Sequence, residues 1–230
     1  MHAAAYPTLG EIVAANPAAA RTLDRLGLDY CCHGQRNLAD ACATAGLNPA
    51  EVLAGLETLP VEGDCSWNGM EPAALVDHIV ATHHRYLEAE LPLLDALAGK
   101  VLSVHGERHP ELGQVRTLVA AIRAELEPHI RVEEERIFPA IHGSSTDPLS
   151  ASLSELLTTM EEEHEQAGDL LADLRRATAA YEVPADACAS YRSLLERLEA
   201  LELDTHLHVL KENHALLPKM RRMTGDRGEG

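Results

Sequence analysis

The stretch His129-Ile-Arg-Val-Glu133, followed by Pro139, is the most informative part of the sequence, because the same pattern returns later in the chain. The second copy reads His208-Val-Leu-Lys-Glu212 and is followed by Pro218. In an α-helix, side chains four residues apart lie on one face, a single turn apart. Each copy can therefore offer an imidazole nitrogen and a carboxylate oxygen to the same metal centre.

Two single histidines extend the repeat, since His84 precedes the first pair by 45 residues and His164 precedes the second by 44. Apolar residues around these positions keep a spacing of three and four, which predicts that they lie on the buried faces of helices. A buried, unpaired carboxylate costs on the order of several kcal/mol, so Glu133 and Glu212 need a cation or a full set of hydrogen bonds there. The candidate metal ligands are His84, His129, Glu133, His164, His208 and Glu212.

A solvated ion pair is the ordinary explanation for one His-x3-Glu pair on a helix. Here two copies come with matched prolines and matched preceding histidines, and all six residues fall on predicted core faces. That combination favours a metal site over surface ion pairs.

The composition narrows the classes of protein to which the chain can belong. Its 230 residues, 46% of them apolar, suffice for one large domain or two unequal ones. The chain has no apolar run long enough to span a membrane, and no basic stretch precedes the apolar residues at its start, so we expect a cytoplasmic protein without a secretory signal. The net charge of −18 argues against nucleic acid as a partner and suits a protein that handles cations.

Residues that typically begin or end helices are frequent, and the alternation of apolar and polar residues that is typical of strands is nearly absent. The sequence therefore predicts an all-α protein. Thr8-Leu-Gly-Glu11 is a capping box that begins a first short helix. Asn16-Pro17 and Asn48-Pro49 each begin another, and Asn37 caps a further one that ends at Gly46. These signals predict a cluster of short helices at the N-terminus.

The chain divides into four parts. We expect a small helical domain over residues 1–58, a linker over 59–71, an up-down-up-down four-helix bundle over 72–223 and a disordered tail over 224–230. Pro128 is expected to kink or widen the second bundle helix next to the candidate site. The bundle helices are expected near Pro72–Ala98, Glu111–Ile141, Pro148–Ala180 and Asp186–Met223.

Five cysteines, an odd number, argue against a disulfide framework. Cys31 and Cys32 are adjacent, and a disulfide between neighbours needs an unusual peptide geometry. We expect these two to be exposed, redox-active thiols in a loop between short helices. Cys42 and Cys188 are expected to be small core residues.

Further polar residues lie close to the candidate ligands in the sequence. Glu125 stands one turn before His129, and Glu163 directly precedes His164. As spare carboxylates near the centre, these two could form an iron or proton path. His83 and His206 are expected to point away from the site and to be exposed. His105 and His109 are expected in a loop, where they could support the ligands or contact solvent, and solvent is favoured.

The donor set narrows the choice of metal. Mixed histidine and carboxylate ligation differs from thiolate-rich structural zinc sites and from all-oxygen calcium or magnesium sites. Six ligands exceed the need of one tetrahedral zinc, whereas two ions could each take two histidines and share both glutamates. Ferritin-like bundles need two Glu-x-x-His motifs, and only Glu161 to His164 has that spacing here. Two iron ions, joined by an oxo or hydroxo bridge, therefore fit best.

Two motifs together resemble the RIC family, which comprises di-iron proteins for the repair of iron centres. Asp29-Tyr-Cys-Cys-His-Gly34 resembles the small ScdA-type domain of that family. One difference from the family is Leu217, because family members commonly read Leu-Phe-Pro where this chain has Leu216-Leu217-Pro218. The hemerythrin-like domain of the family is matched by the series His84, His129/Glu133, His164 and His208/Glu212.

The resemblance implies a non-haem di-iron protein of the bacterial cytoplasm that helps to restore iron-sulfur clusters damaged by nitric oxide or peroxide. It assigns the iron ligands to the same six residues, with Glu133 and Glu212 as bridges. The implied partners are damaged iron-sulfur proteins, nitric oxide or oxygen as small ligands, and an external electron donor. Two alternatives stay open, an oxygen or nitric oxide binding or sensing protein and a nitric oxide reductase, as does a homodimer.

Overall fold

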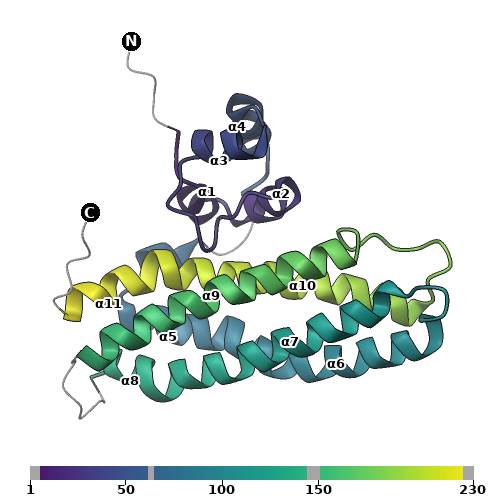
Figure 1. The fold of residues 1–230 in the computed structure, drawn as a ribbon. Coiled ribbons are helices and arrows are strands. Elements are labelled where there is room, and N and C mark those ends of the chain that lie inside the picture. The colour runs from purple at the N-terminus through teal and green to yellow at the C-terminus, as the bar shows by residue number, and fades with distance from the viewer. Residues whose placement is uncertain (1–5, 62–64, 144–150, 225–230) are drawn as a thin grey trace.

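The computed structural model describes residues 6–61, 65–143 and 151–224, and these residues form helices and one isolated antiparallel bridge, between Thr8 and Asn37. The all-α prediction is therefore confirmed. Figure 1 shows a small N-terminal unit stacked on the side of a long bundle, next to α9 and α10. The short helices of that unit are α1 (Leu9–Ala15), α2 (Ala20–Leu26), α3 (Leu38–Ala45) and α4 (Pro49–Glu57).

The N-terminal unit begins and ends its helices at the residues that the sequence indicated. Thr8 accepts from the Glu11 backbone N–H while the Glu11 carboxylate accepts from that of Thr8, which completes the capping box. Gly27 and Gly46 end α2 and α3 with left-handed φ angles of 67° and 70°, a conformation that favours glycine. The Gly10 N–H donates to the carbonyl oxygen of Gly34 at 2.8 Å and ties α1 to the loop between α2 and α3.

The bundle consists of four rods in up-down-up-down order (Figure 1). Each rod that contains a His-x3-Glu pair is interrupted by a π-turn that begins at the glutamate, and the first rod contains a third π-turn, Val80–His84. The rods are α5 (Pro72–Ile79) with α6 (Arg85–His105), α7 (Glu111–Val132) with α8 (Phe138–Ile141), α9 (Ala151–Ala177), and α10 (Ala189–Lys211) with α11 (Leu217–Thr224).

The rod ends differ in detail from the prediction. The first rod continues to His105, beyond the predicted end at Ala98, and the fourth starts at Ala189 instead of Asp186. The predicted start of the third helix, Pro148, lies outside the described residues, as do residues 225–230 of the predicted tail. Within the described part, no helix is long and apolar enough to cross a membrane.

The π-turns have a physical explanation in the matched prolines. In the second rod the π-turn is Glu133–Ile137, and the Phe138 N–H donates to the Glu133 carbonyl oxygen, five residues back. A wider turn suits Pro139, because a proline has no N–H to donate and its ring would clash with the carbonyl four residues back in a regular α-helix. Pro128 lies within regular α7, so the widened turn starts five residues after it and not at that proline.

The candidate ligands form a polar layer between two clusters of buried apolar residues. On the bundle rods, one cluster includes Ile79 and Phe138, and the other includes Leu87 and Leu126. The first cluster continues into the core of the N-terminal unit. It also includes Trp67, which is 1% exposed, so the segment predicted as a linker packs into the core in this part. The N-terminal unit is thus packed against the metal-site end of the bundle.

Candidate metal centre

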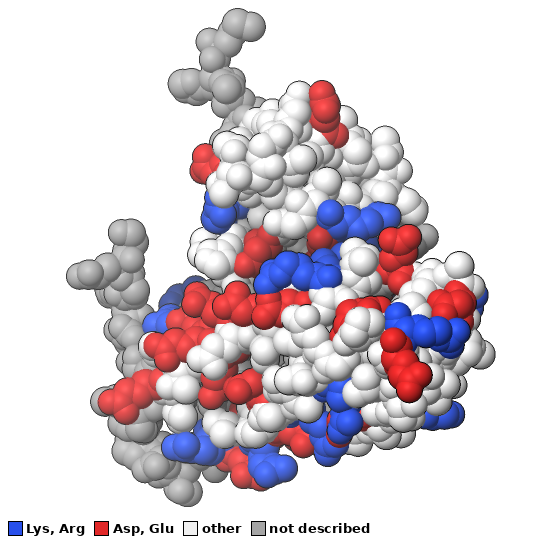
Figure 2. Space-filling model, turned by 45° about the vertical axis from the view of Figure 1, so that its right-hand side comes forward, with Lys and Arg blue, Asp and Glu red and all other residues white. Residues whose placement is uncertain are grey.

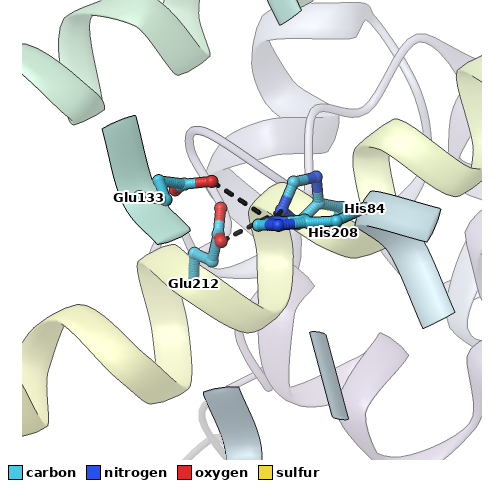
Figure 3. Close-up of side chains that lie close together, drawn as sticks. All are labelled: His84, Glu133, His208 and Glu212. Carbon is cyan, nitrogen blue, oxygen red and sulfur yellow. Dashed lines mark hydrogen bonds and ion pairs between the residues drawn. The ribbon is translucent and has the colours of Figure 1, made fainter. Parts of the chain in front are cut away.

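The six candidate ligands converge at one level of the bundle. His84 and His208 come together with Glu133 and Glu212, and all four residues are buried (Figure 3). The second group consists of His129 and His164 with the same two glutamates. Each of the four rods thus supplies one histidine, and the second and fourth rods also supply the shared carboxylates.

The distances within each group are those of ligands around a common centre. The Glu133 carboxylate oxygens lie 3.3 Å from Nε2 of His84 and 3.3 Å from Nε2 of His129. The Glu212 carboxylate oxygens lie 3.0 Å from Nε2 of His208 and 3.1 Å from Nε2 of His164. Each glutamate therefore reaches one histidine of both groups, which is the placement of a bridging carboxylate.

Three of the four histidines have an oxygen atom beside their other ring nitrogen. The Nδ1 of His84 lies 2.9 Å from a Glu134 carboxylate oxygen, and that of His129 lies 2.7 Å from Glu163. A carboxylate only accepts, so these Nδ1 atoms are protonated, and in the neutral imidazole each Nε2 then has the lone pair. This is the tautomer that a metal ligand needs.

The orientation of His164 is fixed through an asparagine. The Asn213 Nδ2 donates to the Cys31 backbone carbonyl at 3.1 Å, which leaves its Oδ1 to face the His164 Nδ1 at 2.9 Å. The His164 Nδ1 must then be the donor, and its Nε2 has the lone pair. Asn213 thereby connects a candidate ligand in the bundle to the cysteine loop of the N-terminal unit.

These tautomers bring like groups face to face. The Nε2 atoms of His129 and His164 are 3.1 Å apart, so in the neutral rings two lone pairs would point at each other. Such a contact is repulsive unless a proton or a metal cation lies between the nitrogens. Two nitrogens bound to one ion at about 2.1 Å would lie about 3.0 Å apart at a right angle and about 3.4 Å apart at a tetrahedral angle. The observed spacing of 3.1 Å is therefore compatible with two nitrogens on one ion.

The electrostatics of the centre also call for positive charge. Burial alone would lower the pKa of His129, but Glu133, Glu163 and Glu212 together raise it well above its ordinary value. Burial alone would raise the pKa of Glu212, but His208 and His164 hold it well below its ordinary value. Both oxygens of Glu133 and Oε2 of Glu212 are buried without a hydrogen-bond donor. These residues fit a site for metal cations.

Comparisons with known proteins agree with this geometry. Residues 75–220 match the family model described as the hemerythrin HHE cation binding domain, and residues 6–60 match the model ScdA_N, a domain of unknown function. The iron-sulfur cluster repair protein ScdA of Staphylococcus haemolyticus is 30% identical over 213 residues, which cover 92% of this chain and 96% of that protein. This chain belongs to the ScdA/YtfE family of iron-sulfur cluster repair proteins.

Other family members show the same extent of similarity. ScdA of Staphylococcus epidermidis is 29% identical over 216 residues, 92% of this chain and 96% of that protein. YtfE of Escherichia coli is 29% identical over 214 residues, 92% of this chain and 94% of that protein. The similarity to the ScdA/YtfE family therefore extends over both the N-terminal unit and the bundle.

Glu163 and Glu125, the two further carboxylates that the sequence indicated in this ScdA/YtfE family member, lie in different surroundings. Glu163 contacts the His129 Nδ1, as described above, and its side chain is 39% exposed, so it joins the site to the surface. Glu125 is exposed, and its part in an iron or proton path stays a prediction. The next residue of α7, the apolar Leu126, is the one that is buried here.

Two histidines expected to be exposed are enclosed by neighbours. His83 is 4% exposed, stacks on the His208 ring at 5.3 Å and lies 2.7 Å from the Lys211 Nζ. Burial lowers the pKa of His83 to about 4. The His206 side chain is 15% exposed, and its Nδ1 lies 2.9 Å from an Asp24 carboxylate oxygen in α2. Both predictions of exposure are wrong because α10 is covered by the first rod and by the N-terminal unit.

The loop histidines and Cys188 also depart from expectation. His105 is 4% exposed and is the last residue of α6, with its Nε2 3.1 Å from the Cys188 Sγ. His109 is partly buried between Glu111 and Asp186, each at 3.0 Å. Cys188 is exposed at the start of α10, so the expectation of a core cysteine is wrong there.

The other cysteines are placed as follows. Cys42 is a buried core residue of α3, as predicted. Cys31 is 4% exposed and Cys32 is partly exposed, so the expected exposure of both thiols is wrong for Cys31. The hydrogen bond between Cys31 and Cys32, together with burial, raises the pKa of the Cys31 thiol well above its usual value, so this thiol is protonated at neutral pH. A redox role for the pair stays a prediction.

Sequence reasoning did not find Glu134 or Asn213, the partners of His84 and His164. Each directly follows a candidate bridging glutamate in the sequence. On a regular helix that position would face away from the centre, but here each glutamate begins a π-turn. The paired carboxylates in Glu133-Glu134 were the only available signal.

Proposed function

We propose that the bundle binds two iron ions. His84 and His208 would hold one ion, His129 and His164 the other, and Glu133 and Glu212 would bridge them. Six nitrogen and oxygen donors, two of them shared carboxylates, support a pair of iron ions over one tetrahedral zinc. Bound there, iron would supply one-electron redox chemistry and coordination positions open to a small ligand.

We further propose that the protein takes part in the repair of damaged iron-sulfur clusters by releasing iron to them. The single observation behind this proposal is a pair of buried His/Glu groups that could each hold a metal ion, in a chain that resembles, over 92% of its length, proteins named for cluster repair. Each ion would have four protein ligands, two histidines and two shared glutamates, so neither is enclosed by a complete octahedral set. Incomplete coordination suits iron that must leave again.

In this proposal, different residues of the chain have different roles. The glutamates neutralise the two cations, and Glu134, Glu163 and Asn213 hold three imidazole rings in the tautomer that binds metal. The apolar clusters on both sides exclude water from the layer between them. Damaged iron-sulfur proteins would be the recipients of the iron.

The proposal is tested by mixing the iron-loaded chain with a dehydratase whose cluster has lost iron. We expect recovery of dehydratase activity beyond that given by free iron at equal concentration. The matched control is the Glu133→Gln variant, which keeps the shape of the side chain but removes a bridging charge. Recovery no greater than with free iron would reject iron donation.

A separate experiment tests the two alternatives, nitric oxide binding or sensing and nitric oxide reduction. The reduced, iron-loaded chain is mixed with nitric oxide and its spectrum is followed while nitrous oxide is measured. A stable, reversible adduct without nitrous oxide would indicate binding or sensing. Nitrous oxide formed at the expense of an added electron donor would indicate a reductase.

A further inference from the structure

The loop between α2 and α3 turns two thiols toward one carboxylate. The Asp29 Oδ1 accepts from the backbone N–H groups of Cys31 and Cys32, both at 3.0 Å, and its Oδ2 lies 2.7 Å from the His33 Nδ1. This turn brings the two Sγ atoms to 3.6 Å from each other and the Cys31 Sγ to 3.3 Å from the Asp29 Oδ1. Three ligand atoms of metal-binding type thus lie together.

The spacing of the two sulfur atoms is that of ligands on one ion. A disulfide would require about 2.05 Å, so the pair is not bonded. Two thiolates on one tetrahedral ion at about 2.3 Å would lie about 3.8 Å apart, and a thiolate and a carboxylate oxygen about 3.6 Å apart. The observed distances of 3.6 Å and 3.3 Å need only a small adjustment to reach these values.

A cavity gives cations access to the thiols. It has a volume of about 290 Å³ and lies between the N-terminal unit and the bundle, with Cys31 and Cys32 in its wall. Arg175, also in the wall, is paired with Glu202. Figure 2 shows acidic side chains over the bundle below the N-terminal unit, with basic ones along the seam. The acidic residues that line the cavity are Asp24, Asp29, Glu165, Asp169 and Glu202.

We propose that Asp29, Cys31 and Cys32 form a second metal site, separate from the six-residue centre, which binds one thiophilic divalent cation such as Fe²⁺ or Zn²⁺. Thiolates favour ions of this class over magnesium or calcium. Binding would form two metal–sulfur bonds, and the two thiol protons would pass to water. No electron is transferred, so the step needs no oxidant or reductant.

The second site is a close neighbour of the bundle centre. The Cys32 Sγ lies 3.6 Å from the backbone carbonyl oxygen of His164, and Asn213 bridges His164 to Cys31. A test must therefore distinguish ions at the thiols from ions in the bundle. Sulfur ligation provides the distinction, because the bundle centre contains only nitrogen and oxygen donors.

The test is a Co²⁺ titration of the full chain, followed by the thiolate-to-cobalt charge-transfer absorption. We expect the band to reach the intensity of one thiolate-bound Co²⁺ per chain at saturation, whatever amount the bundle takes up, and to fall at least tenfold in Cys31→Ser and in Cys32→Ser. The double variant Glu133→Gln/Glu212→Gln should keep the band, which separates this site from the bundle. Cys188→Ser is the matched control, because Cys188 is the cysteine that contacts His105.

A second measurement uses the unmodified chain and does not depend on the folding of a variant. Zn²⁺ should slow alkylation of Cys32 at least tenfold and leave alkylation of the exposed Cys188 unchanged. Absence of the cobalt band, its persistence in both loop variants, its loss only in Cys188→Ser, or equal alkylation of Cys32 with and without Zn²⁺ would overturn the second site.

Discussion

At the scale of single residues, the centre is defined by what each histidine contacts on the side away from the proposed metal. Glu134, Glu163 and Asn213 accept from three Nδ1 atoms. The Nδ1 of His208 is buried without a hydrogen-bond partner, and its ring is held by stacking on His83. Metal affinity should therefore depend on residues that do not touch the metal.

Glu163 and Glu125 make a matched pair for testing this dependence. Removal of the Glu163 carboxylate charge in Glu163→Gln weakens the hold on His129, so we expect metal affinity to fall about 10–100-fold. Glu125→Gln changes an exposed carboxylate and should leave affinity within error. Competition with a chelator measures both. Equal losses in the two variants would mean that overall negative charge, and not the contact with His129, is responsible.

Asn213→Ala should have two effects at once. It removes the acceptor for His164 and the donor to the Cys31 carbonyl, so we expect metal affinity to fall about 10–100-fold and hydrogen exchange to accelerate in residues 28–34. Asn48→Ala, which removes a helix cap in α4, is the control and should change neither. Unchanged exchange in the loop would contradict the bridge that we assign to Asn213.

The sequence predicts the residues of the centre better than their surroundings. The i, i+4 spacing of a His-x3-Glu pair fixes a common face whatever the tertiary structure, so these positions can be read from the chain. Glu125 stands at the same spacing on the other side of His129, and because each four-residue step turns a helix by about 400°, Glu125 and Glu133 are about 80° apart around the axis. Packing decides which residue then points inward, and here it is Leu126.

At the scale of elements, the π-turns determine which side chains can reach the centre. They move Glu134 and Asn213 into contact with ligands from other rods. A single widened turn leaves no periodic pattern in the sequence from which it could be predicted. A following proline is not a reliable signal either, because the π-turn Val80–His84 of the first rod has no proline close after it. Helix starts were predictable because caps act locally. The continuation of the first rod beyond the predicted end at Ala98 was not predictable, because Gly99 lies inside α6 beside the Arg116 guanidinium.

Two glycine variants test how tightly the cysteine loop is seated on the bundle. A Cβ added at Gly34 would lie 2.2 Å from the Tyr30 carbonyl oxygen and 2.2 Å from the His214 Nε2, so Gly34→Ala must displace the loop. We expect a loss of about 1–3 kcal/mol in unfolding free energy. A Cβ at Gly55 in α4 meets nothing within 4 Å, and Gly55→Ala should stabilise by about 0.5–1 kcal/mol.

Urea denaturation measures the unfolding free energy in both glycine variants, and limited proteolysis reports whether the N-terminal unit separates from the bundle. If Gly34→Ala is as stable and as resistant as the unmodified chain, the close fit between the cysteine loop and the fourth rod is not real.

At the scale of the whole molecule, the two apolar clusters hold a charged layer between them. Without cations, burial of Glu133 and Glu212 is costly, so bound metal should stabilise the folded chain. We expect chelation to lower Tm by roughly 5–10 °C for each ion that is present at about a hundredfold excess over its Kd. Calorimetry of loaded and metal-free samples measures the shift. In Glu133→Gln the shift should shrink; a full shift there would place the stabilising ions elsewhere.

The arrangement of the molecule was predictable only in part. Four rods and a small N-terminal domain follow from local signals, since caps and periodicity are properties of short segments. The docking of that domain was not predictable, because it depends on contacts between residues far apart in the chain, such as His206 with Asp24. The same docking explains why Cys31 is buried although it lies in a loop.

The central claim is that six side chains hold a pair of iron ions bridged by Glu133 and Glu212. Mössbauer spectroscopy of the chain loaded with iron-57, together with metal analysis, tests it most directly. We expect two irons per chain with the signature of a magnetically coupled pair, lost in the Glu133→Gln/Glu212→Gln variant. One uncoupled iron per chain, or zinc bound in preference to iron, would contradict the claim.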